Sequence, residues 1–197
     1  MKFTSLAYAQ LARNQPRGAA EAADRALKLS NVAPIRFLAA RIFAETGDKA
    51  RARTLAATFT NQLGAEARAY TKIIDGDIAL KDGDAGQAIQ LFTEANRILD
   101  TWFGRFDLGR AYFAAKGFPQ ADAEFDRCIQ RRGEVLALVQ EDPTYGQFPI
   151  VYYWQGRVRE ELKTLRFADS YAKYLEIRGA STDDPTVADA RRRAASQ

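Results

Sequence analysis

The amino-acid sequence predicts an all-α protein built as a stack of antiparallel helix pairs, and two observations lead to this prediction. Small residues recur near the middle of successive amphipathic stretches, and twelve positions after each one an alanine occurs in the next stretch. Turn-forming residues separate the two stretches of each pair. Self-similarity at a nearly fixed period is typical of a solenoid, in which every unit buries its apolar face against its neighbours.

The recurring positions form five pairs, each with a small residue followed by an alanine: Ala7 and Ala19, Ala40 and Ala52, Gly76 and Ala88, Gly109 and Ala121, and Gly156 and Ala168. Successive small residues are 33, 36, 33 and 47 positions apart, so the last interval contains an insertion of roughly 13 residues. Two antiparallel helices can approach closely only where their crossing carries little side chain. We therefore expect these residues at the contact between the two helices of each pair.

The hydrophobic pattern predicts helices, in chain order, over residues 2–13, 17–29, 33–46, 48–62, 66–81, 84–98, 102–115, 118–139, 149–162 and 165–178. Reversals are expected at residues 14–18, 47–48, 83–84 and 117–119, with a weaker turn signal at 163–164. The helix from 118 should continue to 139 because Val135, Leu136 and Val139 extend its apolar stripe, and 141–149 should be a loop. A last helix is expected over about 185–195, since Asp184 suits its N-cap and Pro185 its first position.

One stretch carries the clearest family likeness. The residues Leu108, Gly109, Tyr112, Ala121, Phe125 and Cys128 resemble the signature of the tetratricopeptide repeat (TPR), with cysteine in a slot that alanine usually holds. The resemblance covers about residues 2–178 and implies a right-handed superhelical solenoid of about five helix pairs plus a C-terminal capping helix. It implies one domain over 1–197, with units at about 2–29, 33–62, 66–98, 102–139 and 149–178. Three further residues depart from the family pattern: Asp75, Gln155 and Arg159.

The last 75 residues carry a second likeness. The segments FDRCIQRRGE, EDPTY, VYYWQGRVREEL and DDPTVADARRR resemble the C-terminal repeat region of large bacterial signalling proteins that contain a serine/threonine-kinase or winged-helix domain. Neither of those domains is present in this sequence. We therefore expect the chain to be the regulatory C-terminal portion of a larger protein.

The composition argues against several classes of function. The chain has no histidine, the commonest general base and transition-metal ligand. Cys128 is the single cysteine, so no internal disulfide can form. No apolar run approaches the roughly 20 residues that a membrane-spanning helix needs. We expect a cytoplasmic protein with no enzymatic activity, no cofactor and no metal site.

The resemblance implies that the first helix of each pair lines the concave surface of the stack and binds a partner there. Aromatic residues and arginines dominate interface energetics, so we expect a groove for a peptide or helix with apolar anchors and acidic groups. The resulting candidates for partner binding are Phe37, Arg41, Tyr70, Asp77, Phe103, Phe106, Arg110, Phe113, Tyr153, Trp154 and Arg157. Any one of the aromatic residues could instead belong to the core between helices.

Within that set, the first candidates are Arg41, Phe106, Arg110, Tyr153 and Arg157. A second candidate site is the loop around Tyr145 and Phe148. Some family members bind chaperone tails with a clamp of lysine and asparagine side chains on the first helices. That clamp is absent here, because the equivalent positions hold Phe37 and Arg41 in one unit and Phe106 and Arg110 in another.

Two other functions stay open. Nucleic-acid binding is suggested by a pI of about 9.2 and by the arginine clusters at 131–132 and 191–193, although acidic residues are interleaved with them. Self-association as a homodimer is suggested by the first unit, which has no polar cap and contains Phe3, Leu6 and Leu11.

Overall fold

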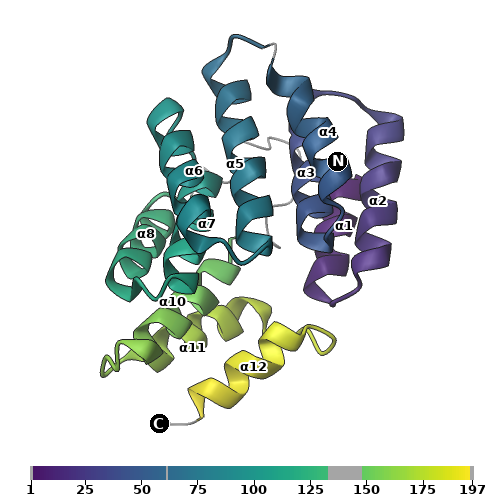
Figure 1. Ribbon diagram of the computed structural model, residues 1–197. Coiled ribbons are helices and arrows are strands. Elements are labelled where there is room, and N and C mark those ends of the chain that lie inside the picture. Colours follow the sequence, from purple (N-terminus) through teal and green to yellow (C-terminus); the bar gives the residue numbers. More distant parts are fainter. Residues whose placement is uncertain (1, 61, 133–147, 196–197) are drawn as a thin grey trace.

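The computed structural model describes residues 2–60, 62–132 and 148–195, and in these ranges it contains helices and no strand. The helices are α1 (Lys2–Ala12), α2 (Pro16–Leu29), α3 (Ala33–Thr46), α4 (Lys49–Thr60), α5 (Ala65–Lys81), α6 (Ala85–Ile98), α7 (Trp102–Ala114), α8 (Phe118–Gln130), α10 (Ile150–Glu161), α11 (Phe167–Arg178) and α12 (Pro185–Ala194). They stack in chain order, and the stack curves so that α12 returns beneath the first helices (Figure 1). None of these helices is both long enough and apolar enough to cross a membrane.

The helices are arranged as pairs in two layers. Each first helix packs against the second helix of its own pair, as α1 does with α2 and α5 with α6, and each second helix also packs against the next first helix. The first helices additionally contact one another in the series α1, α3, α5, α7 and α10. These five helices therefore form the inner, concave layer of an all-α TPR-like solenoid, and α12 packs on α11 at the end of the stack.

All five turns within pairs have the same backbone geometry. In each turn one residue has a positive φ, seven positions after the small residue of the pair: Asn14, Gly47, Gly83, Lys116 and Lys163. The next amide donates to the carbonyl five residues earlier, from Gln15 to Gln10, Asp48 to Phe43, Asp84 to Ala79, Gly117 to Tyr112 and Thr164 to Arg159, at 2.8–3.0 Å. This bond is that of the Schellman motif, which satisfies the last carbonyls of a helix. In the fourth turn the left-handed residue is Lys116, which directly precedes the predicted reversal at 117–119.

The small residues lie where the sequence predicts them, at the contact within each pair. A Cβ atom added to Gly76 would lie 2.5 Å from Phe92 Cε1, and one added to Gly109 would lie 2.6 Å from Phe125 Cε1. Glycine is needed at these positions because each aromatic ring occupies the volume where a side chain would begin. The alanines of the first four pairs, Ala19, Ala52, Ala88 and Ala121, have no exposed surface.

The fifth pair corrects the predicted register. Ala168 is only half-buried, and the ring that contacts Gly156 belongs to Tyr171, fifteen positions later, whereas Phe92 and Phe125 follow their glycines by sixteen. The turn of this pair also differs from the prediction: α11 begins at Phe167 and not at 165, and residues 165 and 166 form an additional turn. The ring at the crossing thus comes one position earlier than in the third and fourth pairs, and Ala168 is not fully buried there.

Two further boundaries were predicted from sequence. The sequence predicted that the eighth helix continues to 139, and this is wrong for residues 131–132, because α8 ends at Gln130 and these two residues form a turn. Residues 133–139 lie outside the described part of the chain. The prediction for the last helix is confirmed: Asp184 caps α12 by accepting from the Thr186 amide at 2.9 Å, and Pro185 is its first residue.

Candidate functional site: the concave surface and its central cavity

Three of the aromatic candidates belong to the core between neighbouring inner helices. Phe37 of α3, Tyr70 of α5 and Phe103 of α7 are each at most 2% exposed. Phe37 stacks on Tyr70 with ring centroids 3.9 Å apart and meets Phe103 edge-on at 5.9 Å. Their side chains fill the seams where one inner helix packs on the next, so no partner can reach them in this structure. Phe106 and Tyr153 are also nearly buried, at 7% and 8% exposure.

The polar candidates on the same three helices form a buried ion cluster. Arg41 of α3 donates through Nε to Asp77 of α5 at 2.9 Å and through Nη2 to Asp107 of α7. Arg110 of α7 donates to Asp107 at 3.1 Å and to Glu45 of α3 at 2.7 Å. Arg41, Asp77 and Asp107 are buried, so their first role is to cross-link the inner layer. We call Arg41, Glu45, Asp77, Asp107 and Arg110 the ion cluster.

The ion cluster has more acidic groups than basic ones, and this imbalance has consequences for protonation. Burial, partly opposed by the neighbouring Arg41, raises the pKa of Asp77 to about 7. The charge of Arg110 lowers the pKa of Glu45 below its ordinary value. Burial raises the pKa of the nearby Tyr8 hydroxyl. Two buried atoms in this region, Asp77 Oδ1 and the Tyr8 hydroxyl, have no hydrogen-bond partner among the described residues.

A cavity of about 500 Å³ lies beside the ion cluster at the centre of the concave surface. We call it the central cavity. Tyr8, Arg41, Glu45 and Arg110 contribute its polar wall, and inner-helix side chains such as Trp154 contribute apolar surface. Its remaining wall comes from the two ends of the chain, namely the turn between α1 and α2 and the residues around the start of α12.

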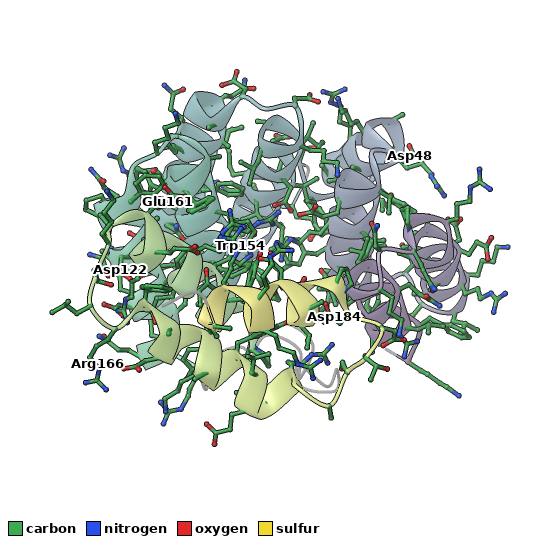
Figure 2. All side chains as sticks on the ribbon, turned by 90° about the horizontal axis from the view of Figure 1, so that it is seen from below. Asp48, Asp122, Trp154, Glu161, Arg166 and Asp184 are labelled. Carbon is green, nitrogen blue, oxygen red and sulfur yellow. The ribbon has the colours of Figure 1, made fainter. Side chains whose placement is uncertain are left out.

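The two ends of the stack approach each other across this cavity. Arg13, in the first turn, forms an ion pair with Asp183 at 2.6 Å, just before α12. Figure 2, seen from below, shows α12 lying across the curved stack, with Asp184 toward the first helices and Trp154 near the centre. The concave surface is therefore partly covered by the last helix and is not an open channel.

The accessible candidates of the concave surface lie next to this cavity, on α7 and α10. Arg157 lies 5.3 Å from the centroid of the Phe113 ring and donates to the Tyr153 hydroxyl at 3.1 Å. Trp154 packs edge-on against Phe113 at 5.4 Å, and Phe113, Trp154 and Arg157 are all half-buried. No carboxylate among the described residues pairs with Arg157, and its Nε is buried without a partner. We call Phe113, Trp154 and Arg157 the Arg157 patch.

The loop candidates are only partly described. Phe148 is half-buried and packs against Tyr152 at 5.5 Å and Trp102 at 6.3 Å, so it continues the aromatic packing of α7 and α10. Tyr145 lies outside the described residues.

Sequence reasoning missed four residues of this region: Tyr8, Glu45, Trp102 and Asp107. Asp107 could have been suspected, because it precedes Arg110 by three positions on one helix, a spacing that brings opposite charges together. Tyr8 and Glu45 carry no such signal, since each meets its neighbours only when the helices stack.

Four of the five arginines in the clusters that suggested nucleic-acid binding are engaged within the chain: Arg131, Arg191, Arg192 and Arg193. Arg193 contacts Asp189 at 2.7 Å and Glu160 at 2.8 Å, and Arg131 contacts Asp100 at 2.7 Å. Arg191 donates to the Gly179 carbonyl. These side chains therefore pair with acceptors of the chain itself.

Comparisons with known proteins agree with this fold. The chain is similar in structure to TTC0263, a thermophilic TPR protein of Thermus thermophilus, with a TM-score of 0.63 and 18% identity over 99% of this chain and 96% of that one. In sequence it is 26% identical over 152 residues to the transcription activator GutR of Bacillus subtilis (strain 168), which covers 72% of this chain and 18% of GutR. No family model matches the chain. The chain thus has the TPR fold, and it spans only a small part of the length of the curated relative.

Proposed function

We propose that this chain is a protein-interaction module whose concave surface binds a partner segment with acidic and apolar side chains. Helical-repeat scaffolds of the TPR fold typically bind proteins, which supports the general role. The observation that carries the finer proposal is the Arg157 patch, a half-buried guanidinium without a carboxylate partner among the described residues, held between aromatic rings.

The chemistry of the patch favours an acidic ligand group. A buried or half-buried charge is costly to leave unpaired, and a carboxylate brought by a partner would supply the missing partner of Arg157. Aromatic rings at 5.3 Å and 6.0 Å from the guanidinium hold it in place by cation–π contact. Trp154 and Phe113 offer an apolar surface beside it, so an acidic residue next to an apolar anchor would fit.

The wider context is also a proposal. GutR is a transcription activator, and the similarity to a part of it supports a role for this chain as the interaction region of a larger bacterial regulatory protein. We place that protein in the cytoplasm and assign this region no catalytic activity of its own.

Partner capture tests the proposal. The intact chain is immobilised, exposed to lysate of its source cells and cross-linked, and the recovered proteins are quantified by mass spectrometry. Replacing Arg157 by Glu should reduce recovery of the specific partner at least about tenfold, since loss of one member of a desolvated charge pair weakens binding by this order or more. The matched control is Arg25→Glu, at an exposed arginine of α2, which should leave recovery unchanged.

The two alternatives give different outcomes in solution. A nucleic-acid binder would bind labelled RNA or duplex DNA with an affinity that falls steeply between 50 and 200 mM salt, by roughly 10³-fold or more for six or more phosphate contacts. Self-association would rest on the first unit, where Leu6 is 38% exposed, and would appear as a dimer in light scattering. Equal recovery of every captured protein by the wild type and Arg157→Glu would refute the assignment of the patch.

A further inference from the structure

The central cavity has the dimensions of a small-molecule site. Its volume of about 500 Å³ falls within the roughly 300–1,000 Å³ that is usual for ligand pockets. A partner helix with its side chains would be about 10–12 Å wide. Its entry into the cavity is restricted by α12 and by the turn between α1 and α2, which are joined by the ion pair of Arg13 and Asp183. The cavity therefore suits a compact ligand better than a long segment of another protein.

The apolar part of the wall is aromatic. Trp102 and Phe106 stack with centroids 5.2 Å apart, and Trp154 lines the cavity from the neighbouring inner helix. Leu11 and Ile150 extend this surface with aliphatic groups. Aromatic rings stack on, or meet edge-on, another flat ring, so this part of the wall favours a ligand with an aromatic body.

The polar part of the wall selects the charge of the ligand. The ion cluster contains two arginines and three carboxyl groups that are already bonded to one another. Since burial raises the pKa of Asp77 to about 7, partial protonation of this carboxyl group reduces the excess negative charge near neutral pH. A cation or an anion entering beside these mutually paired charges would lose its hydration without gaining a free counter-charge in the ion cluster. An uncharged ligand avoids this cost.

The buried polar group of the wall that is left for a ligand is the hydroxyl of Tyr8. Tyr8 lines the cavity, and its hydroxyl is buried with no hydrogen-bond partner among the described residues. Buried polar groups in native proteins are nearly always satisfied, so a ligand that donates or accepts at this hydroxyl would complete the site.

We propose that the central cavity binds a small, uncharged aromatic molecule that hydrogen-bonds to the Tyr8 hydroxyl and packs against Trp102, Phe106 and Trp154. This role is distinct from partner binding at the Arg157 patch, because Arg157 and Phe113 are not part of the cavity wall; Trp154 belongs to both sites. The ligand would be held between the first and last helix pairs, so its binding would also tie the two ends of the solenoid together.

Three probes of nearly equal shape test the charge class: benzamide is uncharged, benzoate is an anion and benzamidine is a cation. The readout is intrinsic fluorescence, because the chain has two tryptophans and both line the cavity; ligand-observed saturation-transfer NMR provides a second measurement. Benzamide should bind with a Kd of about 1 mM, as expected for so few atoms. Benzoate and benzamidine should bind at least tenfold more weakly.

Variants locate the site. Tyr8→Phe removes only the unpartnered hydroxyl, so it should weaken benzamide binding about fivefold while the melting temperature stays the same or rises. Ala12→Phe places a ring in the cavity wall and should abolish binding, whereas Ala57→Phe, on the exposed side of α4, should not change it.

Several results would overturn the proposal. Absence of benzamide binding by the wild type at 50 mM, or undiminished binding by Ala12→Phe, would exclude the cavity as the site. Stronger binding of benzoate would show that the exposed Lys81 at the cavity rim recruits an anion, and stronger binding of benzamidine would show that the carboxyl groups recruit a cation. Failure of partner capture by the Arg157 patch would leave these measurements unaffected.

Discussion

Replacing Arg41 by Met should destabilise the protein strongly, because this change breaks the ion cluster while preserving most of the side-chain volume. Arg41 is the only side chain that donates to Asp77 among the described residues, and it also donates to Asp107, whose side chain has no exposed surface. After the change Asp77 has no cationic partner, and Asp107 retains only Arg110 at 3.1 Å. Breaking a buried ion pair by removing one partner typically costs about 3–5 kcal/mol.

The size of the effect can be followed by urea denaturation and by calorimetry. For a domain of this length each kcal/mol shifts Tm by about 2–4 °C, so the expected loss is roughly 6–20 °C. The control Arg25→Met, at an exposed position of α2, should change the free energy of unfolding by no more than about 0.5 kcal/mol. The cost of Arg41→Met should be smaller at pH 5 than at pH 8, because a protonated Asp77 needs no counter-charge.

A double-mutant cycle separates this explanation from simple loss of packing. If an unpaired carboxylate causes the loss, Arg41→Met combined with Asp77→Leu should be more stable than Arg41→Met alone by at least about 1 kcal/mol. A cost below about 1 kcal/mol for Arg41→Met, or strict additivity of the two changes, would refute a structural role for the ion cluster.

Two further predictions concern the repeat register and the protonation of the cluster. Ala121→Leu should destabilise the protein by about 1–3 kcal/mol, because Ala121 is fully buried at a helix crossing. Ala168→Leu should cost less than about 0.5 kcal/mol, because Ala168 is half-buried and lies outside the crossing. Equal costs of the two changes in urea denaturation would contradict the register shift in the fifth pair. Because the pKa of Asp77 is raised to about 7, the folded protein binds more protons than the unfolded chain between about pH 4 and pH 7, so wild-type stability should fall as pH rises through this window. Asp77→Asn removes this contribution, and its Tm relative to wild type should therefore rise from pH 5 to pH 8; a constant difference would show that Asp77 does not titrate there.

The sequence alone predicted the all-α fold, the pairing of the helices and nearly all of their ends. It could do so because these features depend on local chemistry that repeats. Glycine or alanine is required where a ring such as Phe92 or Phe125 crosses a helix, and the same turn recurs seven residues after each small residue. The one register error, at Ala168, arose where the chain adds a turn without any glycine or proline to mark it.

The candidate site could be predicted only in part. The candidate residues were assigned to helices that do form one inner layer. The sequence could not, however, distinguish a residue that faces the groove from one that fills the seam between two inner helices. Phe37 and Tyr70 lie in the seam, because adjacent inner helices approach closely enough for their rings to stack at 3.9 Å. Arg157 stays accessible because no carboxylate of a neighbouring helix reaches it among the described residues.

Sequence by itself determined how helices pair, since that depends on side-chain size at positions close along the chain. Only the tertiary structure decided which charged side chains pair and where the two ends of the stack contact each other. Arg41 and Asp107 are 66 positions apart, and Arg13 and Asp183 come from opposite ends of the chain. Such contacts depend on the accumulated curvature of the whole stack, which no single repeat encodes.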